Sequence, residues 1–176
     1  MKTYTIVLHG GAVTMDPAKL PPDEEAAIRQ GLREALQAGW EILHRGGAAV
    51  EAVEAAVRAL EDNEHFNAGR GSSLNKQGEV EMDASIMDGR TLKAGAVNSV
   101  RYVKNPVSLA RAVMEKCQHV YISDEGAVEF ALQHGLTMEA VHYFETEKAR
   151  QEWLEIIQDE ETQPQAHDTV GAVALD

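Results

Sequence analysis

Residues 167–173 read His-Asp-Thr-Val-Gly-Ala-Val, and the character of the chain changes abruptly at Thr169. Residues 158–168 are polar and acidic, contain a proline and have no apolar face to bury, which predicts an exposed, mobile linker. From Thr169 onward the residues are mostly apolar, which predicts a β-strand. We therefore expect a strand that has only just begun where the sequence ends.

Thr169 has two interpretations. The simpler one is that it begins a strand, where β-branched residues are common. The other is self-cleavage, in which the threonine hydroxyl attacks the carbonyl carbon of Asp168 and water then opens the resulting ester. The α-amino group freed in this way can act as the base for the hydroxyl of the same residue, so that one residue supplies a complete nucleophile.

The composition describes one acidic globular domain. The chain has 176 residues, 44% of them apolar, with 16 Lys and Arg against 29 Asp and Glu and a formal net charge of -13. The negative charge argues against binding to nucleic acid or to an anionic membrane, because both need a positive field. A single cysteine, Cys117, excludes an intrachain disulfide. Since the sequence shows neither a signal-peptide pattern nor a run of about 20 apolar residues, we expect a cytoplasmic protein without membrane contact.

The predicted elements are a strand, a helical hairpin, a hairpin of strands and then alternating helices and a strand. Asp88 and Gly89, a pair common in hairpin turns, join the two strands of the hairpin. We expect helices on both faces of a mostly antiparallel sheet. The predicted ranges are a buried strand at 3–8, helices at 23–45 and 48–60, strands at 80–87 and 94–100, a helix at 106–116, a strand at 120–123, and helices at 124–134 and 139–157.

The glycine-rich stretch at residues 67–73, Asn-Ala-Gly-Arg-Gly-Ser-Ser, invites comparison with phosphate-binding loops. It lacks the Gly-Lys-Ser/Thr ending of a P-loop, and Leu74 stands where a dinucleotide fingerprint needs its third glycine. A tight loop whose backbone passes close to another group is the better interpretation. The seven histidines show no metal-ligand spacing, so we expect no catalytic metal. His9, at the end of the first strand, is either a site residue or a satisfied core histidine.

Two carboxylates in the predicted hairpin could be taken for an acid/base pair. Asp88 precedes a glycine and is better explained as a turn residue. Asp83 lies in an apolar run and is therefore expected to be buried, where a carboxylate needs hydrogen-bond donors. We expect Asp83 to anchor a loop rather than to act in catalysis.

Six motifs occur in a fixed order along the chain. They are His-Gly-Gly-Ala at 9–12, Phe-Asn-Ala-Gly-Arg-Gly-Ser at 66–72, Val-Glu-Met-Asp-Ala-Ser-Ile-Met-Asp-Gly at 80–89, Gly-Ala-Val at 95–97, Asn-Pro at 105–106 and Thr-Val-Gly-Ala-Val at 169–173. Together they resemble the plant-type L-asparaginase/isoaspartyl peptidase family of N-terminal-nucleophile hydrolases. The resemblance extends almost from end to end of the chain.

This resemblance implies an α+β fold, a four-layer αββα sandwich made as one precursor and cut into an α and a β subunit. Residues 1–168 then form the α-subunit portion, with the linker at 158–168, and residues 169–176 form the first strand of the β-subunit portion. The chain would supply a little over half of the sandwich. The implied partners are the β-subunit segment that begins at Thr169, a second αβ unit in an (αβ)2 heterotetramer, and a small-molecule substrate.

The same resemblance assigns roles to individual residues. Thr169 matches the nucleophile, and Asn67 matches an asparagine that helps to place groups around it. His9, Gly10 and Gly11 match the glycine turn that lines the site. A structural sodium ion, with no cofactor for the chemistry, is implied in a loop whose main-chain carbonyl groups match those of Leu60, Glu61, Asn63, Phe66, Ala68 and Arg70.

The implied reaction is hydrolysis of the side-chain amide of asparagine or of the isopeptide bond in a β-aspartyl dipeptide. One departure matters, because Asp168 stands where many family members have glycine before the scissile bond. The sister family of glycosylasparaginases has His-Asp-Thr at this point, so a glycosylasparaginase-like activity is one alternative. A second alternative is a non-enzymatic scaffold that is never cut. Because the substrate clamp and the oxyanion donors of the family lie in the β subunit, we expect this chain to be inactive alone.

Overall fold

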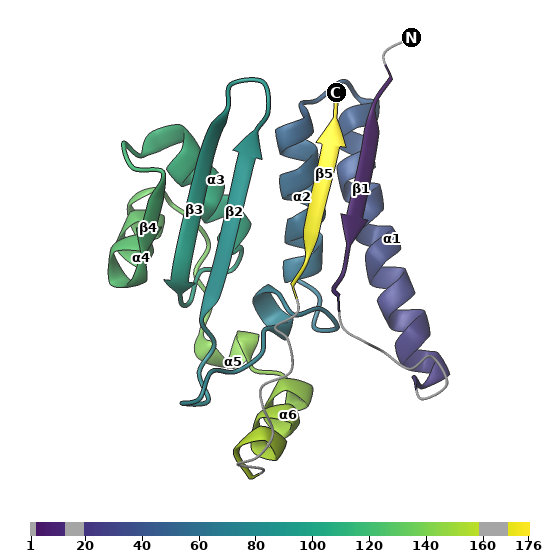
Figure 1. The fold of residues 1–176 in the computed structure, drawn as a ribbon, viewed down its shortest axis with the longest axis vertical. Coiled ribbons are helices and arrows are strands. Elements are labelled where there is room, and N and C mark those ends of the chain that lie inside the picture. Colours follow the sequence, from purple (N-terminus) through teal and green to yellow (C-terminus); the bar gives the residue numbers. More distant parts are fainter. Residues whose placement is uncertain (1–2, 13–19, 159–168) are drawn as a thin grey trace.

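The computed structural model describes residues 3–12, 20–158 and 169–176, and its strands and helices form two layers. The elements are β1 (Thr5–His9), α1 (Pro22–His44), α2 (Ala49–Glu61), the short 3-10 helix η1 (Gly69–Gly71), β2 (Met82–Asp88), β3 (Lys93–Val100), α3 (Pro106–Lys116), β4 (Tyr121–Ser123), α4 (Asp124–Gln133), α5 (Val141–Phe144), α6 (Glu147–Gln158) and β5 (Gly171–Leu175). Figure 1 shows β5 beside β2, so that the five strands lie in one layer.

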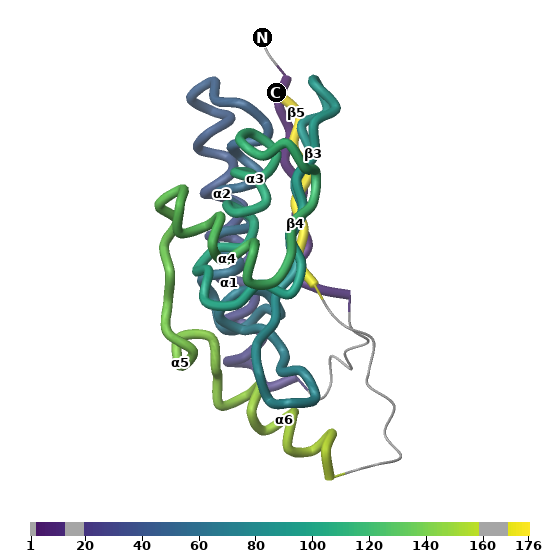
Figure 2. The backbone as a smooth tube through the Cα atoms, turned by 90° about the vertical axis from the view of Figure 1, so that its left-hand side faces the viewer, coloured from purple at the N-terminus to yellow at the C-terminus, as the bar shows by residue number. Residues whose placement is uncertain are grey.

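The strand layer consists of two hydrogen-bonded groups. β1 pairs antiparallel with β5, and in the other group β3 pairs antiparallel with β2 and parallel with β4. α1 and α2 pack on β1 and β5, while α3 and α4 pack on the other group. A mixed helix and sheet fold is thus confirmed. The prediction of helices on both faces is wrong for the described residues, because Figure 2 shows the helices on one side of the strands.

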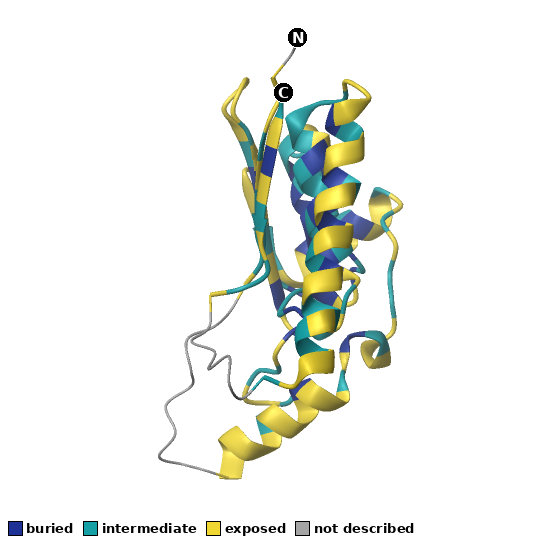
Figure 3. Ribbon diagram, turned by 90° about the vertical axis from the view of Figure 1, so that its right-hand side faces the viewer, coloured by how far each residue is buried: buried dark blue, intermediate teal, exposed yellow. Residues whose placement is uncertain are grey.

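The core lies between the two layers, as the burial colours of Figure 3 show. Ile6 on β1 is 9% exposed and packs with Leu43 of α1 and Ala56 of α2. The opposite face of the same strand is open, and Val7 is 64% exposed. The short apolar run at residues 3–8 predicts a buried strand. That expectation is wrong for the described residues, since helices cover one face alone.

The hairpin of β2 and β3 differs from its prediction at both ends. Asp88 ends β2, and its carboxylate accepts hydrogen bonds from the Arg90 amide (2.9 Å) and the Thr91 hydroxyl (2.8 Å), as expected of a turn residue. The loop nevertheless spans residues 89–92, and the left-handed residue is Leu92 (φ 59°), not Gly89. A four-residue loop that closes with the Leu92 amide on the Asp88 carbonyl (2.8 Å) therefore replaces the expected tight pair.

Asp83 is exposed, so its predicted burial is wrong, and it anchors part of the neighbouring strand β3 rather than a loop. One carboxylate oxygen accepts hydrogen bonds from the Asn98 side chain (2.7 Å) and the Ser99 amide (2.9 Å). These bonds hold a β-bulge between β2 and β3, where Ser99 adopts a left-handed φ of 52°.

The helices follow their predicted ranges closely. α3 has the expected bounds, with Pro106 in its first turn, and α2 is displaced by one residue. The single ragged helix expected at 139–157 is two helices, α5 and α6, separated by residues 145–146. Gln158, predicted to begin the linker, is the last residue of α6, and residues 159–168 lie outside the described part.

Candidate active site

Thr169 lies at the end of the sheet where β5 begins and β1 ends. His9, the last residue of β1, is the register partner of Gly171, the first residue of β5. Because the strands are antiparallel, the two residues before Gly171 and the glycine pair after His9 leave the sheet at the same end. The pairing therefore brings the predicted nucleophile and the predicted glycine turn together, as the course of β1 and β5 in Figure 1 shows.

The glycines at this end are required by close contacts. A Cβ on Gly171 would lie 2.5 Å from Nε2 of His9, so the imidazole ring passes directly over that glycine. A Cβ on Gly10 would lie 2.5 Å from the ring of Phe66. Gly11 has a φ of 146°, which L-residues with a side chain rarely adopt. The His-Gly-Gly turn thus fits tightly against β5 on one side and against the loop at 62–73 on the other.

Asn67 reaches the same region through its neighbour in the chain. Phe66 is buried in a cluster with Leu60 and Ala35, and Val170, the residue after Thr169, packs against this cluster. The side-chain oxygen of Asn67 accepts a hydrogen bond from the amide of Ser73 (2.8 Å), which closes the loop on itself. Since Phe66 and Val170 share one cluster, the residues next to them, Asn67 and Thr169, belong to one neighbourhood.

The loop that carries Asn67 also presents main-chain oxygens at close quarters. A Cβ on Gly69 would lie 2.2 Å from the carbonyl oxygen of Glu61, and one on Gly71 would lie 2.2 Å from that of Phe66. The carbonyls of Leu60, Asn63, Phe66 and Ala68 each accept one backbone hydrogen bond. A carbonyl oxygen has a second lone pair, and oxygen donors suit a hard cation. The close approach of these two glycines and the set of carbonyl oxygens are therefore compatible with the sodium ion that the family resemblance implies.

Glu61 is the buried carboxyl group of the site region. The residue is 3% exposed, one side-chain oxygen accepts a hydrogen bond from the Val107 amide (2.9 Å), and the other has no partner among the described residues. Burial raises the pKa of Glu61 from its ordinary 4.5 to about 8, although the hydrogen bond from Val107 opposes this shift. The carboxyl is therefore largely protonated at neutral pH.

Sequence reasoning missed the side chains around the loop, namely those of Glu61, Asp62 and Tyr143. Tyr143 donates a hydrogen bond to Asp62 (3.2 Å), and burial together with this carboxylate raises the pKa of Tyr143 to about 12. A signal for Glu61 was present, because it falls four residues after Val57 and so on the apolar face of its helix. No local pattern marks Tyr143, which is 81 residues away from Asp62.

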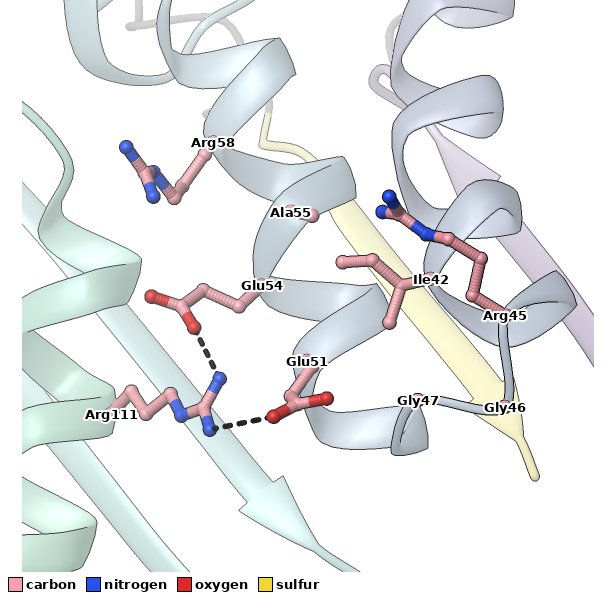
Figure 4. Close-up of a pocket in the computed structure, with 9 residues that line it drawn as sticks. All are labelled: Ile42, Arg45, Gly46, Gly47, Glu51, Glu54, Ala55, Arg58 and Arg111. Atoms are coloured by element: carbon pink, nitrogen blue, oxygen red, sulfur yellow. Dashed lines mark hydrogen bonds and ion pairs between the residues drawn. The ribbon is translucent and has the colours of Figure 1, made fainter.

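A cavity in the described part of the molecule lies away from these residues. It has a volume of about 530 Å³ and lies beside the turn between α1 and α2, whereas the loop with Asn67 follows the other end of α2. Figure 4 shows the residues that line it, among which Arg111 pairs with Glu54 (2.5 Å) and lies 3.9 Å from Glu51. The arginine thereby joins α3 to α2. None of the predicted site residues lines this cavity. We assign its charged residues Arg111 and Glu54 a structural role, because their ion pair connects two helices.

The sequence matches one known family over nearly its whole length. A family model described as asparaginase matches residues 2–176, and the chain belongs to this family. The chain is 45% identical over 175 residues to the isoaspartyl peptidase/L-asparaginase of Bos taurus. The aligned region covers 97% of this chain and 56% of that relative. The chain is 48% identical over 151 residues to the plant-type L-asparaginase of Pyrococcus abyssi. This second aligned region covers 86% of the chain and 47% of that relative.

The resemblance found in the six motifs is thus confirmed. The chain spans about half the length of the curated relatives it matches. Within the part of the chain that the structure describes, helices long and apolar enough to cross a membrane are absent.

Proposed function

We propose that the protein hydrolyses L-asparagine and β-aspartyl dipeptides with Thr169 as an N-terminal nucleophile. The observation that carries the proposal is the convergence of three segments at one end of the sheet: the start of β5, the glycine turn after β1 and the loop with Asn67. The names and the 45–48% identity of the relatives support the same activity.

The first step of this proposal is self-cleavage of the peptide bond between Asp168 and Thr169. Thr169 is among the described residues, and Asp168 is not. The Thr169 hydroxyl attacks the Asp168 carbonyl carbon and the peptide C–N bond breaks, which leaves an ester on the hydroxyl and a free α-amine. Water then hydrolyses the ester, so that Asp168 ends in a carboxylate and the hydroxyl is regenerated.

Hydrolysis of the substrate repeats the same chemistry. The amine of Thr169 takes the proton from its hydroxyl, which attacks the side-chain carbonyl of the substrate. Ammonia or an amino acid leaves with the proton, and water releases aspartate from the β-aspartyl ester. Asn67 helps to place the groups around the nucleophile, and each tetrahedral intermediate needs oxyanion donors. His9, Gly10 and Gly11 line the site.

We further infer that the open face of the strand layer is covered by a second sheet in the complete protein, which gives the four-layer αββα sandwich. The apolar side chains on that face and the greater length of the relatives support this arrangement. The chain then works together with the polypeptide that begins at Thr169, in an (αβ)2 assembly. A sodium ion held by the carbonyls of the loop at 60–70 stabilises the region without taking part in the reaction.

The experiment is made on the full-length protein with Thr169→Ala and, as a matched control, Thr169→Ser. We expect the wild type and the serine variant to yield a fragment beginning at residue 169 in denaturing mass spectrometry, and the alanine variant to stay uncut and inactive. The substrates are asparagine, β-aspartyl-leucine and glycosylasparagine. Cleavage of the third alone favours the glycosylasparaginase-like alternative, and an uncut wild type without activity favours the scaffold.

A further inference from the structure

We propose that Glu61 and Asp62, at the end of α2, are positioning residues that hold the loop with Asn67 in place by binding α3 and α5. This inference rests on the proposed function, because it assigns these residues a task in the same site. Neither is a catalytic residue, since the side-chain contacts of both are with other protein groups.

Glu61 caps a helix that is distant in the sequence. Its side-chain oxygen accepts the hydrogen bond of the Val107 amide, in the first turn of α3, across 46 residues of chain. Asn105, the residue directly before α3, makes no side-chain capping hydrogen bond to that helix. Since the first amides of a helix have no partner inside it, the carboxyl of Glu61 satisfies a buried donor and joins the end of α2 to the start of α3.

Asp62 extends this junction to a third element. One carboxylate oxygen accepts hydrogen bonds from the Asn105 side chain (3.1 Å) and the Tyr143 hydroxyl (3.2 Å), and the other pairs with the ammonium group of Lys104 (3.4 Å). Tyr143 belongs to α5, whereas Asn105 and Lys104 lead into α3. Two consecutive acidic residues thus join three segments where the loop begins.

The far end of the loop returns to the same junction. Gly69 passes so close to Glu61 that a Cβ there would lie 2.2 Å from its carbonyl oxygen. The next residue, Arg70, stacks its guanidinium over the ring of Tyr143 at 5.8 Å from the centroid, and α5 contacts the short helix that begins at Gly69. Because both ends of the loop are fixed at Glu61, Asp62 and Tyr143, the position of Asn67 between them depends on this junction.

The test uses the full-length protein and compares pairs of variants. Asp62→Ala and Glu61→Ala remove the anchors, while Glu61→Gln keeps an acceptor for the Val107 amide. We expect the alanine variants to lower kcat about 10- to 100-fold, as misplacement of a group near the nucleophile does. The KM should change far less, and the glutamine variant should retain most of the wild-type kcat. Asp83→Ala is the control, because it removes an exposed carboxylate with two hydrogen bonds on β2, away from the loop.

Hydrogen exchange supplies a readout that does not depend on activity. We expect Asp62→Ala to speed exchange in residues 62–73 while the exchange of β2 and β3 stays as in the wild type. Tyr143→Phe, which removes a single hydroxyl from Asp62, should do the same to a smaller extent and serves if the alanine variants do not fold. Unchanged exchange in the loop for both Asp62→Ala and Tyr143→Phe overturns the inference, as does an active wild type whose anchor variants keep full kcat.

The two proposals fail in different ways. If the wild type is inactive on all three substrates, the proposed function is wrong, and faster exchange in the loop of Asp62→Ala still supports the junction. If the wild type is active and Glu61→Gln loses as much kcat as Glu61→Ala, the capping contact with Val107 is not what positions the loop.

Discussion

The two faces of the strand layer both carry apolar side chains, but they have opposite surroundings. On the covered face Ile6 and Val97 are buried against helices, and on the other face Val7 and Val173 are 64% and 75% exposed. Alternation along a strand assigns neighbouring residues to opposite faces, so adjacent valine and isoleucine residues report on the two environments separately. The open side of β1 and β5 therefore carries apolar side chains that the described helices leave uncovered.

Contiguous apolar surface of this kind marks a site of interaction in soluble proteins. Helices pack against the covered face, whereas no helix or strand among the described residues packs on the open face. The relatives, about twice as long as the matched part, contain further polypeptide that can fill this role. Substitutions that act on one face and not on the other therefore test the second sheet.

The largest expected effect is at Gly95, on the covered face of β3. A Cβ there would lie 2.1 Å from the Ala110 carbonyl oxygen and 2.5 Å from the Met114 amide nitrogen of α3. Gly95→Ala should lower the free energy of unfolding by about 3 kcal/mol, because backbone atoms cannot move aside as a flexible side chain does. Urea denaturation of the full-length protein measures this change.

The matched control for Gly95→Ala is Gly89→Ala. An added Cβ at Gly89 meets no atom within 4 Å, and its φ is not left-handed. The control should change the free energy of unfolding by no more than about 0.5 kcal/mol. Equal losses in the two variants would show that the close packing of α3 on β3 is not what makes Gly95 necessary.

The next effect distinguishes an open face from one that a second sheet covers. Val173→Thr replaces a methyl group by a hydroxyl at nearly constant shape, which is harmless in water and costs about 2 kcal/mol when the hydroxyl is buried without a partner. We expect that loss in the full-length protein. Val141→Thr, on α5 at the outer side of the helices and 45% exposed, should change stability by less than about 0.5 kcal/mol. If both substitutions are neutral, no second layer covers β5.

Local patterns in the sequence predicted most of the fold. Helix α3 could be placed within its exact bounds because Pro106 marks its first turn, and α1 and α2 because glycines separate them. The bulge at Asp83 could not be predicted, since it depends on a hydrogen bond to Ser99, 16 residues away. The layering was also out of reach, because an apolar run indicates burial and does not say which segment supplies it.

The candidate site was predicted by motif and not by geometry. The family motifs identified Thr169, Asn67 and His9, and the register of β1 with β5 then explains why two of them meet at one end of the sheet. The supporting side chains were missed because their partners are 42 to 81 residues away in sequence. Positions that satisfy a distant donor, as Glu61 does for Val107, have no local signature beyond a carboxyl on an apolar helix face.

The last prediction concerns pH rather than the size of one substitution, and it compares two carboxyl groups, Glu61 on the covered side and Asp83 on the open face. Because burial raises the pKa of Glu61 from 4.5 to about 8, the folded state binds this proton more tightly than the unfolded state. The contribution to stability is full below about pH 4.5 and is lost as the pH rises through about 8. Between these values the free energy of unfolding should fall by about 1 kcal/mol for each pH unit.

The measurement is urea denaturation of the full-length protein at pH 5, 6, 7 and 8, first with choline chloride as the only added salt. Glu61→Gln cannot lose this proton and should remove the slope, whereas Asp83→Asn should keep it because that carboxylate is exposed. A bound cation favours the ionised carboxylate. Added sodium chloride should therefore flatten the wild-type slope if the carbonyls around Glu61 bind sodium. A slope that survives in Glu61→Gln would assign the pH dependence to another group and remove the contrast between the buried carboxyl and the exposed one.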